Sequence, residues 1–203
     1  MKIKIYNNDI PANLKIGSSI AIDTEAMGLN HSRDRLCLIQ ISNGDGTCYL
    51  IKINNVLKKP VNLIKLLKDK KILKIFHYAR FDVGILNYTY GIKVKNIYCT
   101  KIASKLARTF TDKHGYKDLC KNLLNEHILK EEQTSDWGAE KLTLSQQKYA
   151  ATDVLFLHKL RIKLNEILIR ENRIKLAQEC FNFMEYRVML DLSGWSDLDI
   201  FKH

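Results

Sequence analysis

The 203-residue sequence has no long apolar run, only two prolines and no Cys-x-x-Cys pair. Without about twenty consecutive apolar residues a chain cannot form a membrane-spanning helix, so we expect none here. The first twenty residues also lack the apolar core of a signal peptide. No Pro/Gly-rich linker, internal repeat or low-complexity tract divides the chain. These absences favour one globular domain over residues 1–203.

The cysteines are few and odd in number. Their spacing fits neither a disulfide framework nor a zinc site. We therefore expect reduced, packed thiols and a cytoplasmic protein. The five positions are Cys37, Cys48, Cys99, Cys120 and Cys180.

Positive charge is abundant. The chain carries 33 Lys and Arg against 22 Asp and Glu, a formal net charge of +11. An excess of this size favours a polyanionic partner such as nucleic acid or an acidic membrane surface. The alternative is a lysine-rich surface that only keeps the protein soluble. Charge alone does not separate the two.

An apolar run ends in two acids at Ile20-Ala21-Ile22-Asp23-Thr24-Glu25. Residues 20–23 are predicted to form a buried strand, because the run is short and rich in β-branched residues. Side chains alternate along a strand, so Asp23 and Glu25 project to the same side. Two neighbouring carboxylates suit a hard divalent cation such as Mg²⁺ or Mn²⁺. An acidic turn after a core strand is the alternative.

The remaining pattern predicts an α/β fold, a mixed β-sheet flanked by helices. Strands 20–23, 36–42 and 47–51 are expected to form an antiparallel hairpin or meander, because Asn43-Gly44-Asp45-Gly46 is a turn sequence. Thr143 and Gln146 have the spacing of a capping box and mark a helix start. The other expected strands are 3–6, 72–76 and 97–99, and the expected helices are 62–67, 82–90, 101–108, from 143 to about 170, and 174–190.

Three further residues are candidates to join Asp23 and Glu25. Asp82 follows the strand predicted at 72–76, and its ordinary role would be to cap a helix. Asp153 lies among apolar neighbours and needs either solvent or a cation. Tyr149 lies one helical turn earlier on the same face, where it could also be a half-buried core tyrosine.

Together these residues resemble the DEDD superfamily of 3′-5′ exonucleases, whose fold is ribonuclease H-like. Asp23 and Glu25 match its first motif, Asp82 its second, and Tyr149 with Asp153 its third. The tyrosine places the chain in the tyrosine subclass, and the sequence is most similar to ribonuclease D. The resemblance runs from about residue 18 to 160 and includes Gln133-Thr134-Ser135-Asp136-Trp137. Residues 161–203 are expected to form a C-terminal helical extension, too short for the HRDC domains of the long enzyme.

The resemblance implies two divalent cations, Mg²⁺ or Mn²⁺, held by four carboxylates. Asp23 would bridge them, and Glu25 and Asp153 would complete the site on the nucleophile side. Asp82 would support the second ion, mainly through water. Tyr149 would orient the attacking water, since a group with a pKa near 10 is a poor general base.

Six residues are candidates for contact with the substrate. Met27 and Phe81 are candidates to pack on the terminal bases, and Arg80 and Arg108 to bind phosphates. His77 and Trp137 are candidates to shape the pocket. Lys113 and Lys117 are further candidates for phosphate contacts. Each of these side chains also has an ordinary structural explanation.

The predicted function is a metal-dependent 3′-5′ exoribonuclease that releases nucleoside 5′-monophosphates from RNA 3′ ends, in tRNA or other structured RNA processing. One alternative is a DNA exonuclease of the proofreading or Werner type acting on single-stranded ends. A second is a non-catalytic RNA-binding relative. The second is disfavoured, because all four acids and the tyrosine are present. No membrane partner is expected.

Overall fold

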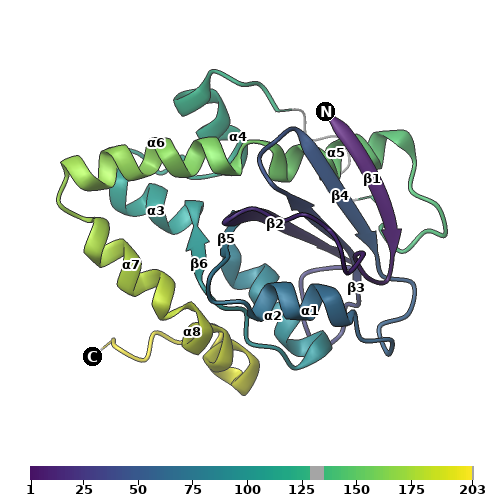
Figure 1. Ribbon diagram of the computed structural model, residues 1–203. Helices are drawn as coiled ribbons and strands as arrows, with labels where there is room; N and C mark the ends of the chain where they lie inside the picture. Colours follow the sequence, from purple (N-terminus) through teal and green to yellow (C-terminus); the bar gives the residue numbers. More distant parts are fainter. Residues whose placement is uncertain (129–134, 203) are drawn as a thin grey trace.

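A computed structural model of the chain describes residues 1–128 and 135–202. Six strands form one mixed sheet, and helices pack around it (Figure 1). The strands are β1 (Lys2–Asn7), β2 (Ser19–Ala26), β3 (Leu36–Ser42), β4 (Thr47–Lys52), β5 (Leu73–Phe76) and β6 (Ile97–Cys99). The helices are α1 (Val61–Lys68), α2 (Ala79–Tyr90), α3 (Thr100–Ala107), α4 (Tyr116–Leu119), α5 (Leu144–Leu155), α6 (Leu157–Arg170), α7 (Ile174–Asn182) and α8 (Met184–Leu190), with π-helical turns at Cys120–Leu124 and Asp191–Trp195.

The sheet has the strand order β1-β4-β3-β2-β5-β6. Strands β2, β3 and β4 form the expected antiparallel meander, and Gly44 and Gly46 supply positive φ angles in the turn between β3 and β4. Strands β5 and β6 add in parallel beyond β2, and β1 pairs in parallel with β4 at the other edge. The predicted α/β fold with a mixed sheet is therefore confirmed.

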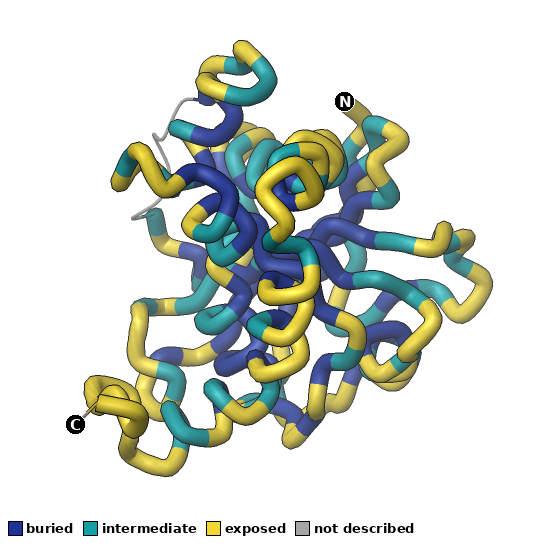
Figure 2. The backbone as a smooth tube through the Cα atoms, turned by 90° about the vertical axis from the view of Figure 1, so that its left-hand side faces the viewer, coloured by how far each residue is buried: buried dark blue, intermediate teal, exposed yellow. Residues whose placement is uncertain are grey.

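The sheet is the centre of the core. Every residue of β3 is buried, and so are Ile20, Ala21 and Ile22 of β2. Helices α5 and α6 lie on one side of the sheet, and α1 and α2 lie on the other (Figure 1). Figure 2 shows the buried segments gathered at the centre. Strand β2 thus runs through the middle of the molecule, and Asp23 and Glu25 lie in its second half.

Helix α5 begins as predicted at a capping box. The Thr143 hydroxyl accepts a hydrogen bond from the Gln146 backbone N–H, and the Gln146 side chain accepts one from the Thr143 N–H. The single long helix expected up to residue 170 is wrong, because the chain breaks at Phe156. Helix α6 then buries a stripe of leucines, spaced three or four residues apart, against the rest of the core. The buried positions are Leu157, Leu160, Leu164 and Leu168.

Two more helix predictions differ from the structure. The helix expected over 174–190 is broken at Phe183 into α7 and α8. Helix α2 begins at Ala79 and not at Asp82, because Tyr78 turns the chain in the left-handed region at φ 66°. Asp82 consequently lies in the first turn of α2, and the N-cap position is occupied by Tyr78. No described helix is long and apolar enough to cross a bilayer.

Candidate active site

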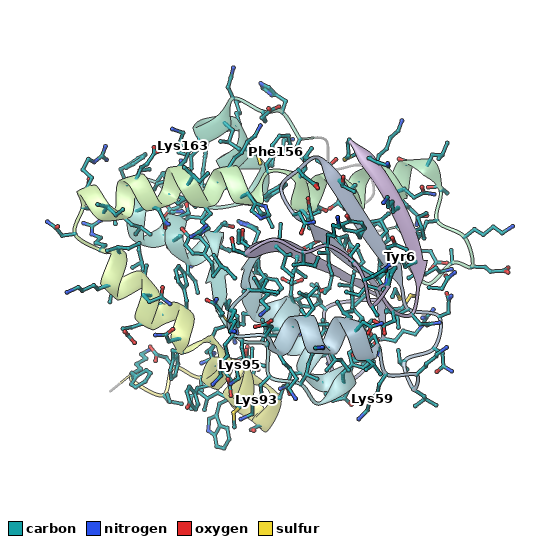
Figure 3. All side chains as sticks on the ribbon, viewed as in Figure 1. Tyr6, Lys59, Lys93, Lys95, Phe156 and Lys163 are labelled. Carbon is teal, nitrogen blue, oxygen red and sulfur yellow. The ribbon has the colours of Figure 1, made fainter. Side chains whose placement is uncertain are left out.

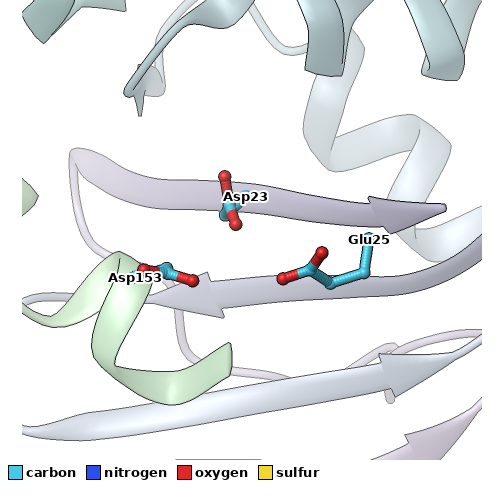
Figure 4. A group of neighbouring side chains, drawn as sticks. All are labelled: Asp23, Glu25 and Asp153. Carbon is cyan, nitrogen blue, oxygen red and sulfur yellow. The ribbon is translucent and has the colours of Figure 1, made fainter. Parts of the chain in front are cut away.

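Strand β2 presents two acids on one face. Asp23 pairs in register with Gln40 of β3, and Glu25 pairs with Leu38. As predicted from strand alternation, the Asp23 and Glu25 side chains project to the same side of the sheet (Figure 4). Helix α5 packs on this side. Both are half-buried, at the point where the apolar segment of β2 ends.

Helix α5 supplies the third acid. Asp153 projects from the helix toward Glu25, and the two carboxylates face each other beside Asp23 (Figure 4). One oxygen from each of these three residues lies within 4.8 Å of the other two. Carboxylate oxygens this close repel one another unless protons or cations separate them. A divalent cation with a preference for oxygen ligands fits this donor set.

Asp82 approaches the same site from α2. Its side chain is 2 % exposed, and its Oδ1 accepts a hydrogen bond from the Thr24 hydroxyl at 2.7 Å. It does not belong to the compact group of three carboxylates, but its charge raises the pKa of both Asp23 and Glu25. The structure therefore brings together the four predicted acids from three segments.

Burial and mutual repulsion raise the pKa values of the carboxyl groups of the site. Burial is the main cause that raises the pKa of Asp23, and the carboxylates of Asp82, Asp153 and Glu25 add to it. Burial, then the charges of Asp153 and Asp82, raises the pKa of Glu25 to about 9. Burial also raises the pKa of Asp82 to about 7, although the Thr24 hydroxyl acts in the opposite direction. The site without a cation therefore holds protons at neutral pH, as expected of carboxylates placed to receive positive charge.

These shifts predict how stability depends on pH. The unfolded chain releases the Glu25 proton near pH 4.5, whereas the folded, metal-free protein keeps it to about pH 9. The contribution of Glu25 to folding is therefore fully present below pH 4.5 and is lost as pH rises toward 9. We expect the melting temperature of the metal-free wild type, minus that of Glu25→Gln, to fall steadily between pH 5 and pH 9.

Differential scanning fluorimetry in EDTA measures both melting temperatures. Groups that titrate in the same way in the two proteins drop out when the melting temperature of Glu25→Gln is subtracted. Mg²⁺ should raise the melting temperature of the wild type more at pH 8 than at pH 6, because binding must displace fewer protons. Parallel curves for the two proteins across this range would contradict the assignment of Glu25 to a proton-holding cluster.

Tyr149 lies beside the acids. Its hydroxyl hydrogen-bonds with Asp153, one helical turn away, and its ring packs on Trp137 with centroids 6.0 Å apart. Burial, followed by the charges of Asp153, Glu25 and Asp23, raises the pKa of this phenol above its usual value. In the metal-free site Tyr149 therefore keeps its proton at neutral pH. It can donate a hydrogen bond.

Of the predicted base-stacking residues, Met27 is 51 % exposed. Phe81 is half-buried and packs against His31, with ring centroids 5.0 Å apart. Trp137 is 2 % exposed behind Tyr149. Of the segment expected to precede it, Gln133 and Thr134 lie outside the described residues. Contact of Met27 and Phe81 with a base stays a prediction.

The polar candidates have partners within the protein. Arg80 forms a bidentate ion pair with Asp191, with distances of 2.6 and 2.8 Å. Arg108 is 4 % exposed, and its guanidinium donates to the Lys113 carbonyl oxygen at 2.9 Å. His77 Nδ1 lies 2.9 Å from the Thr100 hydroxyl. Whether these three side chains touch a substrate stays a prediction.

The lysines are spread over the molecule. Figure 3 labels four of them, which project from its periphery: Lys59, Lys93, Lys95 and Lys163. Lys93 and Lys95 pair with Glu185 of α8, and Lys163 pairs with Glu166 one turn along α6. The positive charge therefore does not single out one lysine, Lys113 and Lys117 included, as a phosphate contact.

Two polar residues beside the acids were not identified from the sequence. Thr24 hydrogen-bonds Asp82, and the Gln40 amide lies 3.5 Å from a Glu25 carboxylate oxygen. Gln40 is fully buried within an otherwise apolar strand, Leu36-Cys37-Leu38-Ile39-Gln40-Ile41. A buried amide in such a strand requires a polar partner, and that signal was available in the sequence. The sequence contained no such signal for Thr24, because strand alternation places its side chain on the face of the sheet opposite to Asp23 and Glu25.

A sequence family described as 3′-5′ exonuclease matches residues 5–169. Among curated relatives, ribonuclease D of Gluconacetobacter diazotrophicus is 34 % identical over 158 residues, which are 76 % of this chain and 39 % of the relative. DNA polymerase I of Aquifex aeolicus is 36 % identical over 147 residues, which are 72 % of this chain and 24 % of the polymerase. The chain thus spans about two fifths of the ribonuclease D and a quarter of the polymerase.

The structure is similar to that of Brucella melitensis NrnC along its whole length. NrnC bound to pGG is 50 % identical with a TM-score of 0.95, and the match covers 100 % of this chain and 99 % of that one. NrnC with bound Mg²⁺ is 49 % identical with a TM-score of 0.94 and complete coverage of both chains. Escherichia coli RNase D, at 24 % identity and a TM-score of 0.75, shares the fold over 89 % of this chain.

Proposed function

Because this chain belongs to the 3′-5′ exonuclease family, we propose that it is a metal-dependent 3′-5′ exoribonuclease. It removes nucleotides from RNA 3′ ends and releases nucleoside 5′-monophosphates. One observation carries the proposal. One carboxylate oxygen from each of Asp23, Glu25 and Asp153 lies within 4.8 Å of the other two, and the Tyr149 hydroxyl hydrogen-bonds with Asp153. A binding protein on a degenerate nuclease fold would have no need of this costly cluster of like charges.

The residues divide the work. When bound, two divalent cations such as Mg²⁺ or Mn²⁺ would activate water and neutralise the leaving 3′ oxyanion. Asp23, Glu25 and Asp153 would hold one, and Asp23 and Asp82 the other. The Tyr149 hydroxyl, which hydrogen-bonds with Asp153, would orient the attacking water. Partial burial of the acids lowers the local dielectric constant and strengthens each of these electrostatic contacts.

The substrate class is proposed from the relatives. The full-length match to NrnC bound to pGG, an RNA fragment, favours very short RNA as a substrate of this chain. The match to ribonuclease D favours longer RNA, such as tRNA precursors, but the chain spans only about two fifths of those enzymes. We therefore place short RNA first and structured RNA processing second.

A DNA exonuclease is the second candidate function. The observation in its favour is the 36 % identity with DNA polymerase I of Aquifex aeolicus. The four carboxylates serve either substrate, since the cleaved bond is the same. Discrimination depends on contacts with the ribose 2′-hydroxyl, which the protein can make through its backbone.

The C-terminal helices are proposed to belong to the exonuclease domain itself. Helix α7 packs on β6 and α3, α8 packs on α2, and the Arg80–Asp191 ion pair joins α2 to the π-helical turn that follows α8.

The cysteines, all of them free thiols, are compatible with a reducing compartment, and we place the enzyme in the cytoplasm.

The test uses 5′-labelled pGG, a 5′-labelled seven-nucleotide RNA and the matching DNAs, each with Mg²⁺, with Mn²⁺ and with EDTA. We expect stepwise shortening of RNA from its 3′ end, fastest for pGG, slower loss of DNA, and none in EDTA. Shortening from the 5′ end, or cleavage that persists in EDTA, would overturn the proposed function. Equal rates on RNA and DNA would favour the second candidate.

A further inference from the structure

Thr24 lies between the two acids of β2 but faces away from them. Strand alternation places Asp23 and Glu25 on the α5 side of the sheet and Thr24 on the side that α2 covers. Its hydroxyl donates to Asp82 Oδ1 at 2.7 Å, and both side chains are buried, Thr24 being 5 % exposed. Strand β2 therefore bears Asp23 and Glu25 and also holds Asp82 through Thr24.

Asp82 needs such a restraint more than the other acids do. It comes from α2 and is not part of the compact group formed by Asp23, Glu25 and Asp153. In that position a carboxylate turns away from the acids that repel it unless another bond holds it. The Thr24 hydroxyl fixes Oδ1, and the backbone N–H groups of Asp82 and Thr24 also bond to the carboxylate, so β2 holds Asp82 through both the side chain and the backbone of Thr24.

The chemistry of the donor matters as well. A lysine or arginine at this position would hold Asp82 more strongly, but its charge would compete with a cation for the carboxylate. A hydroxyl is neutral and supplies one proton, so it orients Asp82 and leaves its negative charge available. The β-branched threonine also has few rotamers, and the direction of the bond is therefore restricted.

We propose that Thr24 is a positioning residue that aims Asp82 at the second cation, and so sets the affinity of that half of the site. The inference rests on the proposed function for its catalytic consequence, but its structural part concerns cation binding alone. Partners of metal ligands in other proteins contribute about 10- to 100-fold in metal affinity or activity when removed. We expect an effect in that range.

The test compares Thr24→Val, which keeps the shape and removes the hydroxyl, with Thr24→Ser, which keeps the hydroxyl. Calorimetric titration with Mn²⁺ should show the weaker binding step of Thr24→Val weakened about 10-fold or more, and Thr24→Ser within about threefold of wild type. On pGG, the Mg²⁺ concentration for half-maximal rate should rise in the Val variant. The KM for pGG at saturating Mg²⁺ should stay unchanged.

The control is Ser42→Ala. Ser42 is 1 % exposed, and its hydroxyl donates to the Thr47 carbonyl oxygen at 2.8 Å in the β3–β4 hairpin. Its loss should lower the melting temperature without changing Mn²⁺ binding, which separates positioning from a general loss of stability. If Thr24→Val does not fold, Thr24→Ala answers the same question.

Mn²⁺ binding by Thr24→Val within twofold of wild type would overturn the proposal, and so would a loss that Thr24→Ser fails to rescue. The failure of the proposed function looks different. In that case the wild type binds Mn²⁺ but degrades no nucleic acid, and the calorimetric comparison still decides the role of Thr24.

Discussion

Replacement of Asp23 with asparagine is expected to reduce kcat/KM on RNA by about 10³-fold or more, at least ~4 kcal/mol of transition-state stabilisation. We propose that Asp23 serves both cations, because its carboxylate lies close to Glu25 and Asp153 and is also affected by the charge of Asp82. The amide cannot carry the negative charge on which the binding of a dication depends. The measurement is single-turnover hydrolysis of 5′-labelled pGG at saturating Mg²⁺.

The fold should survive this change. The asparagine side chain is nearly the same size as that of aspartate, and it carries no charge that burial and the neighbouring acids, which raise the pKa of Asp23, would disfavour in the metal-free protein. The melting temperature in EDTA is therefore expected to stay equal or rise, while the stabilisation by Mg²⁺ disappears. The matched control is Glu166→Gln, which removes an exposed acid of α6 and should leave turnover unchanged. An Asp23→Asn enzyme with near wild-type turnover would contradict the site assignment.

Replacement of Tyr149 with phenylalanine should lower kcat at saturating RNA by roughly tenfold to a thousandfold, the range for losing one orienting or proton-handling group. The ring packing on Trp137 is retained, and the variant lacks only the hydroxyl that hydrogen-bonds with Asp153. Mn²⁺ affinity and the KM for RNA should change little. Steady-state kinetics with a parallel Mn²⁺ titration measure all three quantities.

Tyr98→Phe is the control for a hydroxyl with a structural role. Tyr98 is 5 % exposed, and its hydroxyl donates to Asn165 Oδ1 at 2.9 Å, a bond that joins β6 to α6 and involves none of the four acids. This variant should lose about 1 kcal/mol of stability and keep its kcat. If Tyr149→Phe behaves in the same way, with a lower melting temperature and an unchanged kcat, Tyr149 belongs to the core and not to the catalytic site.

Local signals in the sequence predicted the elements that carry the acids. The apolar run before Asp23 predicted a buried strand, and the capping box at Thr143 predicted the start of the helix that bears Tyr149 and Asp153. Both signals depend on residues close together in the chain. The distance between the acids of β2 and Asp153 of α5 depends instead on residues far apart in the chain. The resemblance to an exonuclease family predicted that these acids meet, which local patterns could not.

Features set by tertiary packing were not predictable in the same way. The helix breaks at Phe156 and Phe183 contain neither proline nor glycine, and the apolar period runs on across them. The left-handed turn at Tyr78 uses a residue that rarely adopts this conformation. The hydrogen bond from Thr24 to Asp82 joins residues 58 positions apart. In each case contacts distant in sequence decide the outcome, and single-sequence patterns do not contain them.

The most direct test of the site is the anomalous scattering of Mn²⁺ in crystals grown with pGG and the slow Tyr149→Phe variant. We expect two peaks about 4 Å apart. One is expected among the carboxylates of Asp23, Glu25 and Asp153, and the other between Asp23 and Asp82. No peak among these four carboxylates at saturating Mn²⁺, with pGG clearly bound, would contradict the assignment of this cluster as the catalytic metal site.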